Sequence, residues 1–270
     1  MRLVRFAPRP MVGLFAFLLV LASLAGQARA QTMLDQEQRL IEVHSLLIAL
    51  TPGNAPGVYR PGEVSLGLEL IVIPSIDGTT GGKRQITASD RTPVFPRPRL
   101  AIGLPAPADF RAFAGIAYVP PIPINDVTSH QGALEAGLAW APGGPLTVGL
   151  RGHLLVARST SPVTDPRTKD TLDTIEFGAD VSAGYRIGLG WLSVTPFASL
   201  GITHVAGDFM VTSDNYTLSS KTTNPSVTGG VRLSALPGFE ATAELVAFPG
   251  RLVHPAFRLA WVPDWFAKKE

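Results

Sequence analysis

Hydrophobic and polar residues alternate along most of this chain, and the alternation is clearest between residues 174 and 204. Every second residue in the first half of this stretch is apolar, whereas Glu176, Asp180 and Arg186 stand among the residues between them. After a Gly-Leu-Gly turn at 188–190 the same pattern resumes. Period-two alternation is typical of a β-strand with one apolar face. We therefore predict a hairpin of two long strands here.

The same alternation recurs from residue 63 onward and is interrupted by turn-forming residues. The predicted strands are 63–73, 97–104, 110–119, 129–140, 146–157, 175–187, 192–202, 226–235, 239–247 and 255–262. Soluble strands average about 5–6 residues, whereas tilted strands of about 9–11 residues span a bilayer. We predict an all-β fold, a closed antiparallel up-and-down transmembrane β-barrel of about 10 strands, with about 8 or 12 as alternatives. A soluble sandwich that buries the apolar face is the main structural alternative.

The predicted connections alternate in length. Long polar connections, at 74–96, 158–173 and 207–225, follow the first, fifth and seventh strands, and medium connections follow the third and ninth. Short turns follow the second, fourth, sixth and eighth strands. Transmembrane barrels have short periplasmic turns and longer external loops. We therefore expect the short turns to face the periplasm.

Aromatic residues cluster at strand ends beside the short turns or near the C-terminus. They are Trp140, Tyr185, Trp191, Phe239 and Trp261, with Phe110 as a further member. Such a cluster predicts a periplasmic-side aromatic girdle. The last strand, with FRLAW at 257–261, resembles the aromatic-bearing final strand of bacterial outer-membrane β-barrel proteins, although the chain continues through 263–270. This superfamily-level resemblance covers about 63–266 and implies the outer-membrane assembly machinery as a partner during biogenesis.

Residues 1–30 have the pattern of a secretory signal peptide. Three arginines precede the apolar core 11–24, and residues 28–30 have the A-x-A form of a cleavage site. We predict four regions: a cleaved signal peptide at 1–30, a helical segment and linker at 31–61, an outer-membrane barrel at 62–266 and a tail at 267–270. The predicted location is the outer membrane, with the lipid bilayer as a partner.

Residues 31–51 carry a helical pattern. Leu40, Val43, Leu47 and Leu50 recur at helical spacing, and a Pro-Gly pair follows. Two placements fit this helix: a periplasmic or interfacial cover of the barrel base, or a plug inside the lumen. We favour the cover, because a broad apolar stripe does not suit a charged lumen.

The polar faces of the predicted strands carry a nearly balanced set of charges. The set is Glu69, Arg97, Arg99, Glu135, Arg151, His153, Glu176, Asp180, Arg186, Arg232, Glu240, Glu244 and Arg258, with Arg111 as an addition. A lipid-facing Arg or Lys at the midplane costs roughly 2–4 kcal/mol, so this face should line the lumen. Because isolated buried charges are very costly, we predict a salt-bridged, largely plugged lumen.

Turn positions predict which of these charges lie opposite each other. A turn centred on Gly143 places Glu135 opposite Arg151. A connection centred on Arg251 places Glu244 opposite Arg258 in the same way.

Candidate chemistry is sparse. The chain has no Cys, which excludes disulfides and thiolate metal sites. Its histidines, at 44, 130, 153, 204 and 254, show no metal-ligand spacing. The net charge of +2 gives no signal for a nucleic-acid partner. His153 with Asp180 or Ser182 could form a catalytic arrangement, but a lumen histidine satisfied by hydrogen bonds explains them as well. We assign no catalytic residue, metal or cofactor.

The sequence thus favours a structural role or the transport of small solutes or lipids in a Gram-negative-type outer membrane. Two alternatives stay open. One is an outer-membrane enzyme acting on lipid or peptide, and the other is a surface-binding or adhesion barrel that uses its external loops.

Overall fold

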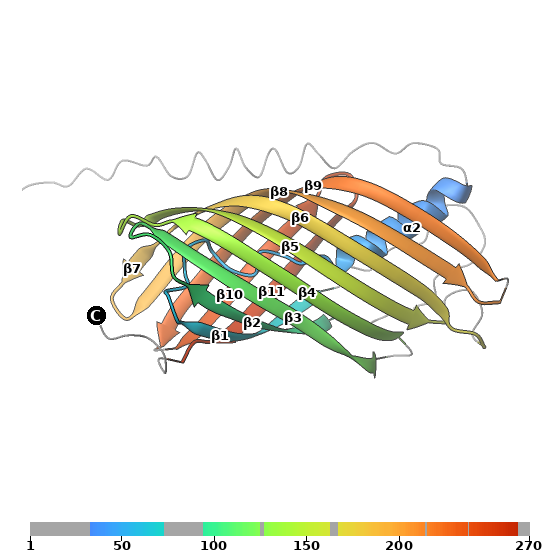
Figure 1. Cartoon of the computed structure of the whole chain (residues 1–270), viewed down its shortest axis with the longest axis horizontal. Coiled ribbons are helices and arrows are strands. Elements are labelled where there is room, and N and C mark those ends of the chain that lie inside the picture. Colours follow the sequence, from blue (N-terminus) through green and yellow to red (C-terminus); the bar gives the residue numbers. More distant parts are fainter. Residues whose placement is uncertain are drawn as a thin grey trace, which may run out of the picture.

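The chain folds into one antiparallel sheet that closes into a barrel (Figure 1). The computed structural model describes residues 33–72, 94–124, 127–162, 167–213, 215–236 and 238–263. Its strands are β1 (Val64–Val72), β2 (Val94–Leu104), β3 (Phe110–Ile124), β4 (Val127–Trp140), β5 (Leu146–Ser161), β6 (Asp170–Tyr185), β7 (Ile187–Leu189), β8 (Leu192–Val211), β9 (Tyr216–Leu236), β10 (Phe239–Phe248) and β11 (Leu252–Trp261). β1 pairs with β11, and β6 pairs with β8 around the short β7, so ten long strands close the barrel. The predicted ten-stranded, all-β barrel is confirmed.

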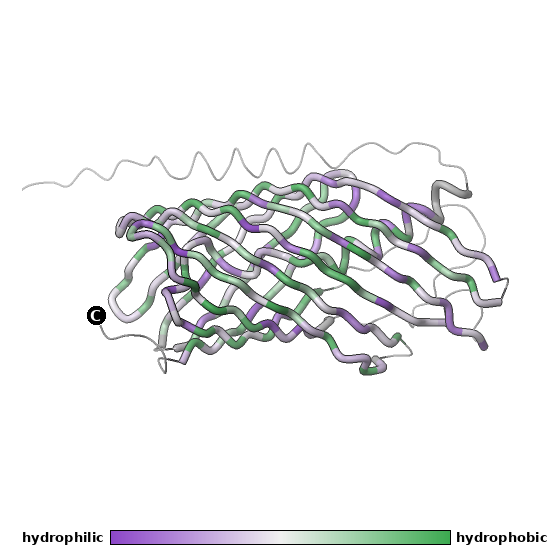
Figure 2. The backbone as a smooth tube through the Cα atoms, in the orientation of Figure 1, coloured by the Kyte–Doolittle hydropathy of each residue, from purple (hydrophilic) through white to green (hydrophobic). Residues whose placement is uncertain are grey.

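The outward faces of the strands are apolar. Leu134, Leu150, Val181, Leu200 and Leu259 each expose more than half of their surface. Figure 2 shows hydrophobic and hydrophilic positions alternating along the strands. An apolar surface this extensive is unfavourable in water and suits a hydrocarbon environment. The soluble sandwich is wrong, because that fold would have buried this face.

Two of the predicted hairpin registers are wrong by two residues. In β4 and β5, Glu135 lies opposite His153, and Arg151 lies opposite Gly137. The last pair before the turn is Trp140 and Val148, so the hairpin is centred on residue 144 and not on Gly143. A shift of two residues changes the partners and keeps every side chain on its predicted face.

The β10–β11 hairpin shows the same shift. Arg258 lies opposite Thr242, and Glu244 lies opposite Ala256. β11 begins at Leu252, so the connection is a tight turn centred on Gly250, whose positive φ of 74° suits glycine. The predicted strand start, at residue 255, is three residues too late because a proline there interrupts the pattern.

Several predicted loops are strands. β8 ends only at Val211 and β9 already begins at Tyr216. Most of the region expected as a loop at 207–225 is therefore paired β-structure. The β5–β6 hairpin likewise reaches into 158–173. Threonine, which is frequent in these hairpins, favours extended structure although it is polar. The connection at 73–93, the signal peptide at 1–30 and the residues from 264 onward lie outside the described residues.

The two ends of the barrel differ. The turns after β2, β4, β6 and β9 lie at one end, near the point where β1 begins and β11 ends. Trp140, Tyr185, Trp191 and Phe239 are exposed near these turns, and Phe110 pairs with Trp140 at the same end. We refer to it as the short-turn end. At the other end β1 ends and β2 begins, and the paired strands β8 and β9 extend furthest there, so we refer to it as the hairpin end.

The N-terminal helix does not cover the short-turn end as we expected. α2 (Met33–Leu47) lies at the hairpin end and contacts the inner faces of β6, β8, β9 and β11 (Figure 1). Its Val43, Leu46 and Leu47 pack against an apolar patch of the wall that includes Val205 and Phe248. The expected cover is wrong because the inner wall is charged along its middle and apolar near the hairpin end. No helix in the described part of the chain is long and apolar enough to cross a membrane.

Candidate functional site

A row of six buried charges crosses the inner wall of the barrel. In order they are Arg97, Glu69, Arg99, Glu135, Arg151 and Asp180, contributed by β2, β1, β2, β4, β5 and β6. Neighbouring oppositely charged groups along this arginine–carboxylate row lie 2.7 to 3.2 Å apart. Each of the three arginines therefore has a carboxylate partner, which offsets the cost of burying it.

One glycine allows the row to cross β3. Arg99 on β2 reaches Glu135 on β4 with two contacts of 2.8 Å. The β3 residue opposite Glu135 is Gly115, and a Cβ there would lie 2.9 Å from the glutamate Oε1. A larger residue on β3 would separate the two charged side chains.

The same three arginines bind the backbone of residues 48–52, which follow α2. Arg97 donates to the carbonyls of residues 48 and 49, at 2.7 and 3.0 Å. Arg151 donates to the carbonyls of residues 50 and 51, at 3.0 and 2.7 Å. Arg99 donates to the carbonyls of residues 51 and 52, at 3.1 and 3.4 Å. Buried carbonyls need such partners, so the charged row supplies the hydrogen bonds that an irregular segment inside a barrel otherwise lacks.

Further contacts fix the segment along the lumen axis. Toward the hairpin end, the Leu50 amide donates to Glu176, and the hydroxyls of Ser45 and Thr174 lie 3.2 Å apart. At the middle of the barrel, the Thr51 hydroxyl donates to Glu69 at 2.7 Å. The segment is held from several sides.

The segment continues to the short-turn end. The Gly53 amide donates to Glu244 at 3.0 Å, and its carbonyl accepts from Arg258 at 3.3 Å. Glu244 and Arg258 were predicted to face each other, and they instead meet the same residue of the segment. Tyr59 then packs against Phe113 with ring centroids 5.1 Å apart.

A turn at residues 60–63 reverses the chain from the segment into β1. The Glu63 amide donates to the Arg60 carbonyl at 3.0 Å, and the Arg60 amide donates to the Glu63 carboxylate at 2.8 Å. Burial raises the pKa of the Glu63 carboxyl, and the Arg60 amide opposes that rise. Residues 48–63, which we call the lumen segment, thus run from α2 to the base of β1.

Inward-facing glycines make room for the N-terminal residues. A Cβ on Gly103 would clash with the Arg60 carbonyl oxygen. A Cβ on Gly149 would lie 2.8 Å from Pro56, and one on Gly207 would lie 2.8 Å from Ile41 of α2. Glycine in a strand often marks such a close approach. These glycines are a signal in the sequence for a filled lumen, and a prediction from alternation and charge alone misses it.

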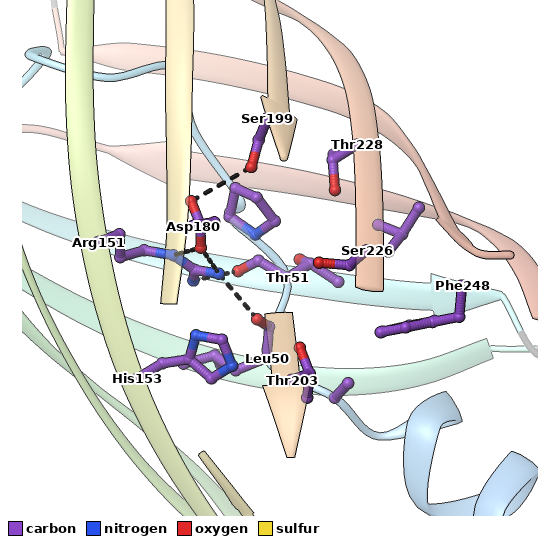
Figure 3. Close-up of a pocket in the computed structure, with 13 residues that line it drawn as sticks. Leu50, Thr51, Arg151, His153, Asp180, Ser199, Thr203, Ser226, Thr228 and Phe248 are labelled. Carbon is purple, nitrogen blue, oxygen red and sulfur yellow. Dashed lines mark hydrogen bonds and ion pairs between the residues drawn. The ribbon is translucent and has the colours of Figure 1, made fainter. Parts of the chain in front are cut away.

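A cavity remains between the lumen segment and β8 and β9 (Figure 3). Its volume is about 20 Å³, which leaves room for about one water molecule. One side is formed by residues 49–52 with Arg151, His153 and Asp180, and the other side carries the hydroxyl groups of Ser199, Thr203, Ser226 and Thr228. The lumen therefore has a charged wall that binds the segment and a hydroxyl-bearing wall that leaves space beside it.

The remaining predicted lumen charges are placed differently. Arg232 and Glu240 form a half-buried ion pair near the short-turn end. Arg111 is half-buried on β3. Arg186 is exposed after the last residue of β6, and its amide donates to the Pro145 carbonyl. Its assignment to the lumen needs correction, because the alternation continues past the end of the β5–β6 ladder at Tyr185.

Of the candidate catalytic residues, His153 and Asp180 contact other partners. The His153 Nε2 lies 3.0 Å from the Glu176 Oε1. Asp180 binds Arg151 and accepts a hydrogen bond from Ser199 at 3.3 Å. Ser182 is buried on the inner face of β6. In the part of the chain that the structure describes, no group of three or more histidine, aspartate or glutamate side chains could hold a metal ion.

Comparison with solved structures finds similarities at low sequence identity only. No family model and no curated protein matches the chain. The β-domain of the Bordetella autotransporter BrkA aligns over 76% of this chain and 99% of its own, with 12% identity and a TM-score of 0.40. The translocator domain of the autotransporter NalP from Neisseria meningitidis aligns over 84% and 93%, with 9% identity and a TM-score of 0.48.

The attachment invasion locus protein Ail of Yersinia pestis aligns over 75% of this chain and 99% of its own, with 12% identity and a TM-score of 0.33. At these values the description of this chain as a transmembrane-type barrel rests on its own strand pairing and apolar outer face.

Proposed function

We propose that this protein is a barrel of a Gram-negative-type outer membrane whose lumen is closed by its own N-terminal residues, and that its role is structural. The observation that carries the proposal is the contact between Arg97, Arg99 and Arg151 and the five consecutive carbonyls of residues 48–52. An open diffusion pore needs a free lumen, and porins of about 16–18 strands provide one. Here the space inside ten strands is shared between charged side chains and backbone.

The hydrogen bonds between the lumen segment and the barrel wall support a lumen that stays closed. The carbonyls lose their donors if the segment leaves, and the guanidiniums lose part of their hydrogen bonding in the same step. An unsatisfied buried polar group costs about 1–3 kcal/mol, so removal of several at once is strongly unfavourable. The outward apolar face and the exposed aromatic residues at the short-turn end support the membrane location.

A narrow route for water or small polar solutes is the second candidate function. The cavity beside residues 49–52 favours it, because hydroxyl groups of β8 and β9 line this cavity and could form hydrogen bonds with a solute. In this version the segment stays in place and the cavity is part of a path along it. Lipid transport has no comparable support, since this cavity is lined mainly by polar and charged residues.

Planar-bilayer conductance tests the closed barrel. The refolded mature chain should give no steady unitary current, whereas a variant that lacks residues 31–57 should give stepwise currents. Heat-modifiable mobility on a gel would show that both proteins are folded barrels. Steady unitary currents of equal size from both proteins would contradict closure, and small steady currents from the mature chain alone would favour the narrow route.

A single substitution gives a finer comparison. Arg151→Gln removes a guanidinium that binds the segment, and Arg158→Gln removes an exposed one on the same strand, where Arg158 pairs with Asp173. Arg151→Gln should produce intermittent currents, and Arg158→Gln should behave like the unchanged protein.

A further inference from the structure

We propose that the chain crosses the barrel lumen once and displays the N-terminal part of α2 at the outer surface of the cell. This inference rests on the outer-membrane location proposed above. It goes beyond closure, because a chain that crosses the lumen is anchored at one face of the membrane and exposes α2 at the other.

The lumen segment joins the two ends of the barrel. At the short-turn end, the Gly62 amide donates to the Gly103 carbonyl at 2.9 Å, next to the turn into β1. At the hairpin end, Glu42 of α2 lies 3.1 Å from Arg251, in the β10–β11 turn. Residues 42 and 62 therefore lie at opposite ends of the barrel.

Contacts between these ends follow in order along single strands. On β11 and the turn before it, Arg258 binds Gly53, while Arg251 binds Glu42. On β6, Asp180 binds Arg151, which in turn binds the carbonyls of residues 50 and 51. Thr174 lies six residues closer to the hairpin end on the same strand and contacts Ser45. Wall residues nearer the hairpin end thus meet earlier residues of the chain, which describes a crossing rather than a loop that enters and returns.

The length of the segment agrees with a crossing. Residues 48–63 can extend to at most about 50–58 Å, and the apolar band of an outer-membrane barrel is about 25 Å tall. The extended length of the segment exceeds the height of the apolar band, so the segment can cross the barrel even though it contains turns. The carbonyls of residues 48–53 accept hydrogen bonds from barrel arginines, which fixes the position of the segment in the lumen.

The orientation of the barrel decides which face receives the N-terminal end. Short turns face the periplasm in transmembrane barrels, and longer connections face outward. Five-residue connections, 105–109 and 141–145, close the short-turn end, whereas at the hairpin end β8 and β9 stay paired out to Val211 and Tyr216, well beyond the end of the β9–β10 ladder. β1 therefore begins on the periplasmic side, and α2 lies at the outer mouth.

Cysteine labelling in intact cells tests the display, since the chain has no Cys of its own. Arg39 is exposed on α2, so Arg39→Cys places a thiol near the N-terminal end. Ser213→Cys, in the exposed β8–β9 turn, is the matched control for the outer face. Gly144→Cys, in the exposed β4–β5 turn, is the matched control for the periplasmic face.

A membrane-impermeant maleimide should label the variants at 39 and 213 to similar extents in intact cells. The variant at 144 should be labelled at least tenfold less until the outer membrane is permeabilised. Labelling at 213 with none at 39, where 39 reacts after permeabilisation, would overturn the display and leave the outer-membrane barrel standing. Labelling at 144 with none at 213 would overturn the orientation and the display together.

An epitope insertion guards against a folding defect in the cysteine variants. An epitope inserted between residues 32 and 33 should be accessible to antibody on intact cells, and the same epitope after residue 270 should not. Heat-modifiable mobility of each variant shows that the barrel has formed. An N-terminal epitope that is detected only after permeabilisation would contradict the proposal.

Discussion

Arg151 connects the wall of the barrel to the segment inside it. Its guanidinium contacts Glu135 and Asp180 on the neighbouring strands and donates to two consecutive carbonyls of the lumen segment. A buried charge with this many partners is stabilising only while all of them are present. Arg158, seven residues further along β5, is exposed and forms an ion pair with Asp173 at the barrel surface.

Substitution of these two arginines should therefore have unequal effects. Arg151→Gln should lower the free energy of unfolding by about 3–5 kcal/mol, because two carboxylates lose a buried cation. Arg158→Gln should change it by less than about 1 kcal/mol, because exposed ion pairs contribute little. Urea titration of the proteins folded into lipid vesicles measures both values, and equal losses would contradict the buried row.

The strands show which features of an element can be predicted from alternation alone. Alternation identified the lipid-facing and lumen-facing sides of the long strands, because a period of two depends only on neighbouring residues. It did not identify the hairpin registers, because those depend on the geometry of each turn. It also ended β8 too early and began β9 too late, because polar strand residues beyond the apolar band show no contrast between the two faces.

A lipid-face substitution tests the assignment of faces. Leu150 is exposed, and its cross-strand neighbours Leu138 and Val181 are exposed and apolar as well. Leu150→Arg should destabilise the folded barrel by roughly 2–4 kcal/mol in a bilayer if the residue lies near the midplane. Ser213→Arg, in an exposed turn, should have little effect. Equal tolerance of both substitutions in vesicle-folding titrations would show that the outer face is misassigned.

The helix could be predicted as an element but not placed. Its apolar stripe is visible in the sequence, and the wall that receives it is assembled from Val205 of β8, Val246 of β10 and Leu252 of β11, which no local pattern brings together. The lumen segment was harder to predict, because an irregular stretch has no periodicity. Inward glycines such as Gly103 and Gly149 become meaningful only once the opposing chain is known.

At the scale of the whole molecule, the barrel and its N-terminal residues form one structure. The charged row requires the segment for its full hydrogen bonding, and the segment requires the row because it has no regular backbone pairing of its own. Both proposals, a closed lumen and an N-terminal helix displayed at the outer face, rest on this mutual dependence.

An engineered disulfide tests whether the N-terminal residues lie inside the barrel. The hydroxyls of Ser45 and Thr174 lie 3.2 Å apart, so cysteines at both positions have nearly the separation that a disulfide requires. Ser182 is the matched control, because it lies on the same face of β6 but about 26 Å closer to the short-turn end. Ser45→Cys with Thr174→Cys should cross-link in oxidised membranes and migrate differently on a non-reducing gel, and Ser45→Cys with Ser182→Cys should not. The opposite result, a cross-link to 182 and none to 174, would place the helix at the barrel base and contradict the closed lumen described here.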